Sequence, residues 1–254
     1  MNSVNWKEVS IDYELEYSKA RGGTLEIYSD FIHISNKKVP YGGDYNRTVA
    51  VSARTAERFK EILDIVRKIH KRDGVLPPDR FDFTPPILAP EWQIIADSLG
   101  YRLKTSVYLH SPTLPQQSFP PYRLYFPSDE KFQEWYTEQQ KTRPYWTEQM
   151  LKEIIPIQME FIKVFKPLWL MEGKRPIGWI YCQLHNGFLN VFELELLEEY
   201  RGKGIGHIFM QLIRAEAGRL GAISLIVQTT PEIKNFYIKC GFSVISENTV
   251  LIKK

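Results

Sequence analysis

Three glycines alternate with other residues between Arg201 and Gly206, and an apolar pattern with helical spacing begins directly after them. Glycine has no Cβ atom, so a loop of this kind lets a ligand approach the backbone closely. The first turn of a helix carries free N–H groups and a partial positive charge, which together bind anions such as phosphate. The spacing matches neither the dinucleotide-binding G-x-G-x-x-G loop nor the ATP-binding G-x-x-x-x-G-K-[ST] loop. The stretch therefore predicts a strand, an anion-binding loop and a helix, with a glycine-rich turn that binds nothing as the alternative.

The composition is that of a globular protein, with 254 residues of which 43% are hydrophobic and 25% charged. A net charge of +3 without a block of Lys and Arg argues against a nucleic-acid partner. The first residues lack the features of a secretory signal, and no run approaches the ~18 apolar residues of a membrane span. Cys182 and Cys240 have no spacing typical of a zinc site or a disulfide framework. We therefore expect a soluble, cytoplasmic protein with no metal site and no membrane partner.

The chain divides at residues 110–122, where Pro, Gln and Ser interrupt every periodic pattern, as is typical of a domain linker. Helical and strand-like patterns are mixed on both sides of it, which predicts an α+β fold. After the linker, the patterns predict a helix at 129–141 and a second helical region at 146–165 that Pro156 interrupts. Three strand-like runs then form an antiparallel meander, and the glycine loop, a helix and another strand follow. This order predicts a crossover connection that sets two strands parallel. The predicted organisation is a first domain at 1–110, a linker at 111–121 and a second domain at 122–254.

The glycine loop belongs to a recognisable family pattern. Residues 201–206 resemble the R-x-x-G-x-G motif of the GNAT superfamily of acyl-CoA-dependent N-acyltransferases. Residues 229–242 are similar to the family's N-x-x-A-x-x-x-Y-x-x-x-G-F segment, with Tyr237 in register but with Thr230 in place of Asn and Ile233 in place of Ala. The resemblance covers about residues 120–254. It implies a twisted, mostly antiparallel sheet with one central parallel pair, flanked by helices.

The family resemblance implies transfer of an acetyl group from acetyl-CoA to a primary amine of a small-molecule or peptide acceptor. Tyr237 is the matched candidate for the acid that protonates the departing thiolate, with a packing role as the alternative. Asn190 stands where the family often has a glutamate base, and an amide cannot act as that base. Glu193 and Glu195 on the same strand are the remaining candidates. They share a face if the alternation is regular, whereas a bulge that the family often has here would separate them. Either carboxylate can instead lie on a solvated face or in an ion pair. The resemblance assigns acceptor contacts to Asn190, Tyr145 and Trp146, and acetyl-CoA contacts to Leu194, Glu195, Leu196, Arg201, Gly202, Lys203, Gly204, Ile205, Gly206, His207, Thr230 and Asn235.

The first half of the chain has a similar layout. Residues 81–110 and 226–254 both read as a strand, Thr-Pro, a helix, Gly-aromatic and a final strand. This predicts tandem GNAT-like domains, with an unrelated α+β domain as the alternative for the first half. The segment before the helix predicted at 53–72 has no R-x-x-G-x-G motif, so we expect no cofactor there. Asn190 and Thr230 also keep a second function open, a non-catalytic acyl-CoA-binding or sensing module, and a purely structural protein would bind no coenzyme.

Overall fold

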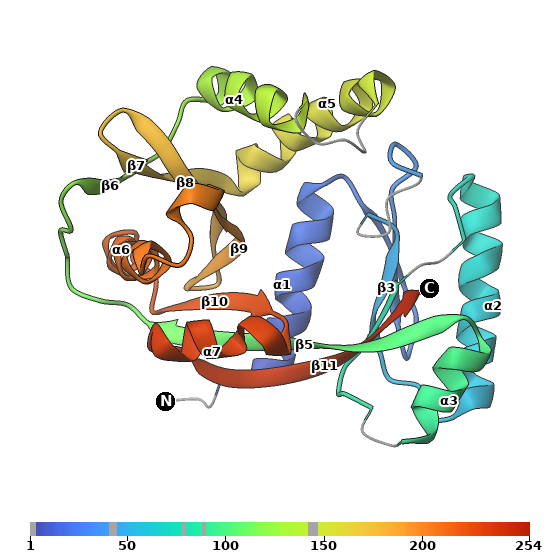
Figure 1. Ribbon diagram of the computed structural model, residues 1–254. Coiled ribbons are helices and arrows are strands. Elements are labelled where there is room, and N and C mark those ends of the chain that lie inside the picture. The colour runs from blue at the N-terminus through green and yellow to red at the C-terminus, as the bar shows by residue number, and fades with distance from the viewer. Residues whose placement is uncertain (1–3, 41–44, 78–79, 88–89, 142–146) are drawn as a thin grey trace. The chain divides into compact units, whose positions relative to one another are not determined.

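The computed structural model describes residues 4–40, 45–77, 80–87, 90–141 and 147–254 (Figure 1). The chain forms two compact units, one from residues 1–107 and 246–254 and the other from residues 108–245. Among the described helices, none is both long enough and apolar enough to cross a membrane.

The first unit is a mixed sheet with helices. Its sheet has the order β1-β2-β3-β4-β11-β5. Strands β3 and β4 are parallel, whereas β1–β2, β2–β3 and β4–β11 are antiparallel. Helix α2 begins after Thr55, whose side chain accepts a hydrogen bond from the Arg58 N–H, and its apolar face packs on the rings of Phe81 and Phe83. The elements are α1 (Trp6–Ala20), β1 (Thr24–Ile27), β2 (Ile32–Ser35), β3 (Arg47–Val51), α2 (Ala56–Asp73), β4 (Arg80–Phe83), α3 (Glu91–Ser98), β5 (Tyr101–Pro112) and β11 (Ser243–Lys253).

The second unit contains the predicted meander and crossover. Its sheet has the order β5-β10-β9-β8-β7-β6, in which β6 to β9 are antiparallel neighbours and β9 and β10 are parallel. Helices α4 and α5 pack together (Figure 1), and Phe132 and Phe161 from them contact Tyr181 on one face of the sheet. The elements are β6 (Tyr122–Tyr125), α4 (Asp129–Lys141), α5 (Glu148–Val164), β7 (Lys166–Glu172), β8 (Arg175–His185), β9 (Phe188–Leu196), the 3-10 turn η1 (Glu198–Tyr200), α6 (Ile205–Arg219), β10 (Ser224–Thr229) and α7 (Pro231–Lys239).

Two long strands supply segments to both units. Residues 108–112 of β5 lie beside β10 in the second unit, where the Ser224 hydroxyl donates to the Ser111 carbonyl over 2.8 Å. Residues 246–253 of β11 lie between β4 and β5 in the first unit, with Leu251 opposite Phe81. The predicted limits 1–110, 111–121 and 122–254 therefore differ from the compact units, and they remain a proposal about which parts fold independently.

One strand of each parallel pair contains a β-bulge. In β9 the register shifts between Phe192 and Glu195, and Glu193 has φ of 54°. In β3 the register shifts between Thr48 and Val51, and Ala50 has φ of 53°. Non-glycine residues with positive φ are uncommon, and a bulge bends its strand. The two units thus share a bulged strand, a helix, a parallel strand and a second helix, which confirms the predicted tandem α+β fold.

Candidate functional site

Strands β9 and β10 pair only over their first residues. Their parallel register runs from Phe188 opposite Ser224 to Val191 opposite Val227. The β9 bulge at Glu193 follows immediately and bends the strand, so the two strands separate beyond this point. The opening lies along residues 193–196 of β9, which include the predicted cofactor contacts Leu194, Glu195 and Leu196, all of them half-buried.

The glycine loop connects this opening to helix α6. Gly202 and Gly204 have φ of 73° and 78°, a left-handed conformation that L side chains rarely adopt. A Cβ atom built on either glycine would have no atom within 4 Å, so the loop is open to a ligand. Within the described chain, the backbone N–H groups of residues 202–206 have no acceptor, and no side chain caps the helix at Gly204. These five donors are suited to a diphosphate, because they have no acceptor and lie in the loop and first turn at a helix N-terminus.

Packing around the loop explains two of its residues. A Cβ atom on Gly206 would lie 3.2 Å from the ring of Phe236 on α7, so a larger residue there would require this ring to shift. The Arg201 Nε donates to the Leu196 carbonyl over 2.9 Å, which ties the start of the loop to the end of β9. The role of Phe236 has no signal in the sequence, because its ring contacts the loop through tertiary packing.

The bulge separates the two candidate bases. Asn190 and Phe192 lie opposite Gln183 and Tyr181, and Glu195 lies opposite Trp179, so these side chains share the face of the sheet that α4 and α5 cover. Leu196 lies on the other face, where it packs near Gly178 and Gly206. Glu193 is exposed at the bulge itself. Of the two candidate bases, Glu195 therefore shares a sheet face with Asn190, which stands at the position where the family often has its base.

Helix α7 carries the candidate acid. The side chain of Tyr237 is buried, and burial raises the pKa of its phenol well above the ordinary value of 10. The hydroxyl therefore stays protonated at neutral pH, as an acid must before it donates. Thr230 is the N-cap of α7 without a side-chain hydrogen bond, and Asn235 is exposed. Both side chains are open to a ligand.

His207 makes contacts that its sequence neighbours do not suggest. Its Nδ1 lies 3.4 Å from the Cys240 Sγ, and its Nε2 lies 2.6 Å from the Gln211 amide. Burial raises the pKa of the Cys240 thiol to about 11, and Cys182 is also buried and free. The His207 ring is thus held against α7 and α6, whereas its backbone lies in the first turn of α6. The 33-residue separation of His207 and Cys240 hides the pair from sequence analysis.

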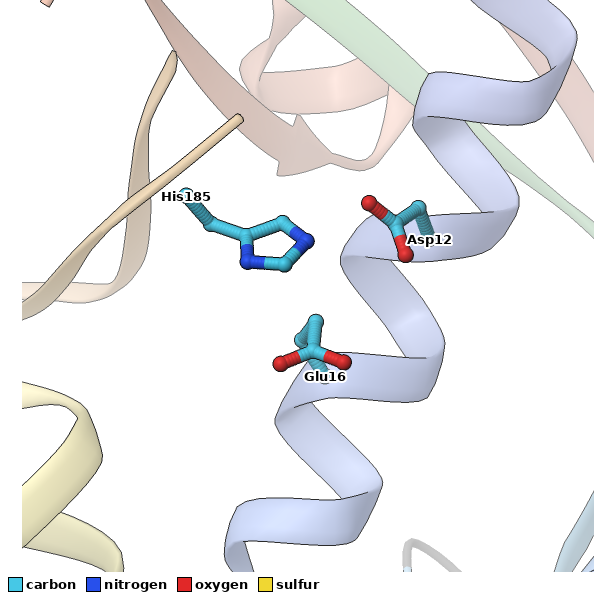
Figure 2. Close-up of side chains that lie close together, drawn as sticks. All are labelled: Asp12, Glu16 and His185. Carbon is cyan, nitrogen blue, oxygen red and sulfur yellow. The ribbon is translucent and has the colours of Figure 1, made fainter. Parts of the chain in front are cut away.

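Two further sets of residues carry no site assignment. Tyr145 and Trp146, the predicted acceptor contacts, lie outside the described residues. Asp12 and Glu16 lie one turn apart on α1 and turn their carboxylates to the same side (Figure 2). The third residue labelled there, His185, ends β8 in the other unit. Neither unit by itself holds all three side chains, so we assign no metal site to them.

The matching helix of the first unit has a different N-terminus. The Thr55 side chain accepts a hydrogen bond from the Arg58 N–H over 3.2 Å, so a side chain of the chain itself caps α2. The Arg58 guanidinium in turn makes two hydrogen bonds of 2.7 and 3.0 Å to the Asp30 carboxylate. This end of α2 lacks the open glycine loop of α6, although the bulge at Ala50 is present.

Comparison with known proteins agrees with this geometry. Residues 166–244 match the family model described as the acetyltransferase (GNAT) domain. Over 80 residues, 32% of this chain, the sequence is 28% identical to the uncharacterized N-acetyltransferase YjcF of Bacillus subtilis (strain 168), and the match spans 57% of that relative's length.

Two solved structures share the fold along most of the chain. One is a GCN5-related N-acetyltransferase from Kribbella flavida, with a TM-score of 0.61, 11% identity, and coverage of 96% of this chain and 95% of that one. The other is a tandem GNAT protein from the clavulanic acid biosynthesis pathway, with a TM-score of 0.51, 10% identity, and coverage of 90% and 78%. Residues 166–244 therefore carry the sequence pattern of the acetyltransferase (GNAT) domain, and the fold along most of the chain is similar to that of a tandem GNAT protein.

Proposed function

We propose that the second unit transfers an acetyl group from acetyl-CoA directly to a primary amine of a small-molecule or peptide acceptor. The observation that carries this proposal is the row of unpaired backbone N–H groups at residues 202–206, placed where the bulged β9 separates from β10. Acetyl-CoA supplies an activated acyl thioester together with a diphosphate that matches these donors. The proposed contacts are Leu194, Glu195, Leu196, Arg201, Gly202, Lys203, Gly204, Ile205, Gly206, Thr230, Asn235 and the backbone of His207.

The proposed chemistry moves two protons. The acceptor nitrogen attacks the thioester carbonyl carbon, the C–S bond breaks, and the product is an amide. Glu195 accepts the proton that the amine loses, directly or through water, because it shares a sheet face with Asn190. Tyr237 donates its phenolic proton to the thiolate. Cys240 takes no covalent part in this scheme, since its thiol is buried and its pKa is raised to about 11.

Binding of the cofactor is tested by thermal unfolding. Acetyl-CoA at 100 times its dissociation constant is expected to stabilise the protein by about 2.7 kcal/mol. Gly204→Val should remove this shift, because the side chain strains the left-handed loop and fills the open cradle. Gly221→Val is a matched control, since Gly221 has φ of 82° beyond the other end of α6 and also has no atom within 4 Å of its Cβ position. Equal acetyl-CoA shifts in both variants would place the diphosphate elsewhere.

Catalysis is tested by thiol release with a panel of primary amines. Tyr237→Phe keeps the ring and removes the hydroxyl, so kcat should fall by ~10²-fold while acetyl-CoA affinity changes little. Glu195→Gln should remove the acidic limb of the pH–rate profile, whereas Glu193→Gln should keep it. The reverse result would assign the base to Glu193.

Asn190 favours a second candidate function, a non-catalytic acyl-CoA-binding or sensing module. Its amide occupies the position at which the family often has a base, and the side chain is buried. This function predicts a full acetyl-CoA stability shift without thiol release for any amine in the panel. Turnover above the rate without enzyme excludes it.

We further propose that the first unit binds no acyl-CoA, since Thr55 caps its corresponding helix. Gly204→Val should then leave no acetyl-CoA shift in the full chain. A residual shift in this variant would contradict the proposal.

A further inference from the structure

The β7–β8 hairpin and the turn before the glycine loop are joined by four side chains. The Tyr200 hydroxyl donates to the Glu172 carboxylate over 2.6 Å, and Arg175 Nη2 lies 2.5 Å from the Glu199 carboxylate. The Arg175 guanidinium also lies over the Tyr200 ring, 5.7 Å from its centroid. Glu172 and Arg175 are cross-strand partners at the end of the hairpin. We call these four residues the hairpin clasp.

The hairpin clasp holds the turn from which the anion-binding loop starts. Glu199 and Tyr200 belong to η1, which ends two residues before Gly202. The Tyr200 N–H donates to the Leu197 carbonyl over 2.9 Å, so backbone and side chain fix this turn together. The hydrogen bond to Glu172 raises the pKa of Tyr200 above its ordinary value, so the hydroxyl keeps its proton and the bond persists at neutral pH.

The hairpin clasp also neutralises an unfavourable charge. Glu199 is exposed close to a loop suited to a dianion, and a carboxylate there repels phosphate. A backbone hydrogen bond and the Arg175 ion pair lower the pKa of Glu199, and Lys203 lowers it further. Lys203 is thus close enough to Glu199 to be attracted by it. Arg175 satisfies Glu199, which leaves the Lys203 ammonium available for a phosphate.

We propose that Glu172 and Arg175 are positioning residues of the acyl-CoA site, although they lie on the hairpin and outside the loop. Glu172 holds η1 through Tyr200, and Arg175 neutralises Glu199 beside Lys203. This inference rests on the proposed function, because it requires the loop to bind the diphosphate of acyl-CoA.

A charge-rescue experiment on the full chain tests the role of Arg175. Isothermal titration with CoA should show affinity about 3- to 5-fold weaker in Arg175→Gln, in line with an exposed ion pair. The double variant Arg175→Gln with Glu199→Gln should bind as the wild type does, because the repelling carboxylate is also gone. The KM for acetyl-CoA should follow these affinities more closely than kcat does. Arg219→Gln is the control, since Arg219 also makes a 2.5 Å pair, with Glu216 at the far end of α6.

A conservative pair tests the role of Glu172. Glu172→Gln keeps an acceptor for the Tyr200 hydroxyl and should preserve CoA affinity, whereas Glu172→Ala removes it and should weaken binding about 3-fold, as one hydrogen bond of modest net strength predicts. Unfolding curves without CoA identify any variant that fails to fold.

The outcomes separate this inference from the proposed function. If the wild type binds CoA and all variants bind it equally, the inference is wrong and the proposed function stands. If the double variant is as weak as Arg175→Gln, Arg175 does not act by neutralising Glu199. If the wild type does not bind CoA, the proposed function and the inference fail together.

Discussion

His33 in the first unit predicts a specific loss of stability in mild acid. Its ring is buried, with Nδ1 3.1 Å from the Thr48 hydroxyl and the His70 ring 5.0 Å away. Burial, with a further contribution from His70, lowers the pKa of His33 from 6.5 to about 3. Glu26 and Asp73 raise this pKa and Arg72 lowers it, but burial dominates. His33 is therefore neutral in the folded chain at pH 5, whereas it is protonated in the unfolded chain.

The sign and size of the effect follow from proton linkage. Below pH 6.5 the unfolded state binds the extra proton, so stability falls as pH falls, and the loss continues until about pH 3. Between pH 7 and pH 5 the free energy of unfolding should decrease by about 2 kcal/mol from His33 alone. Denaturant titrations at both pH values measure it, with His33→Gln as the comparison, because glutamine keeps a polar group without titrating. An equal pH dependence in both proteins would refute the reasoning. Asp73 titrates below this window, because its hydrogen bond to Arg72 lowers its pKa, whereas burial raises the pKa of Asp82. Both carboxylates are the same in the two proteins, so their contributions cancel in the comparison with His33→Gln.

Three other predictions concern the described fold. Deleting residues 1–117 removes the β5 segment beside β10 and should leave a fragment that aggregates. Deleting residues 1–103 keeps this segment, and the fragment should retain a CoA-dependent stability shift. Gel filtration and thermal unfolding distinguish the two fragments, and equal behaviour would contradict the role of β5. Ala50→Gly should raise the free energy of unfolding by roughly 0.5–1 kcal/mol, because glycine tolerates positive φ, and Ala50→Val should lower it. A lower free energy of unfolding in Ala50→Gly would show that the bulge is not strained. Alkylation of Cys240 at pH 8 should be more than ~100-fold slower in the folded protein than in urea, because its pKa is raised to about 11. Mass spectrometry measures the extent of labelling, and fast labelling of the folded protein would contradict this prediction.

The sequence predicted best those features that depend on short-range patterns. The helix predicted at 129–141 coincides with α4 (Asp129–Lys141), and the predicted meander and parallel crossover are present. The loop was predictable because left-handed backbone and glycine go together. One helix was predicted wrongly, since α5 continues through Pro156 where an interruption was expected. The buried residues Ile154, Ile157 and Phe161 hold this helix on both sides of the proline, so packing outweighs one missing backbone donor.

Other features have no local signal. Helix α1 was not predicted, because it buries Ser10, Glu14 and Ser18 and so shows little apolar periodicity. Glu14 pairs with buried Arg47 of β3, a strand that was also missed. Within the site, the loop and the positions that match the family motif could be predicted from the sequence. The contact of His207 with Cys240 and the hairpin clasp could not, because they join residues that are distant in sequence. The bulge that separates Glu193 from Glu195 was considered from family resemblance, and the register shift in β9 confirms it.

The place of β11 in the first sheet has a consequence for synthesis on the ribosome. Residues 246–253 lie between β4 and β5, yet residues 108–245 must be translated before them. At ~5–20 residues per second, the first unit waits on the order of ten seconds for the strand that fills its sheet. During this interval the facing edges of β4 and β5 lack their partner and are open to pairing with other chains. Nascent chains of this protein should therefore depend on chaperones over the first unit until translation of the last strand is complete.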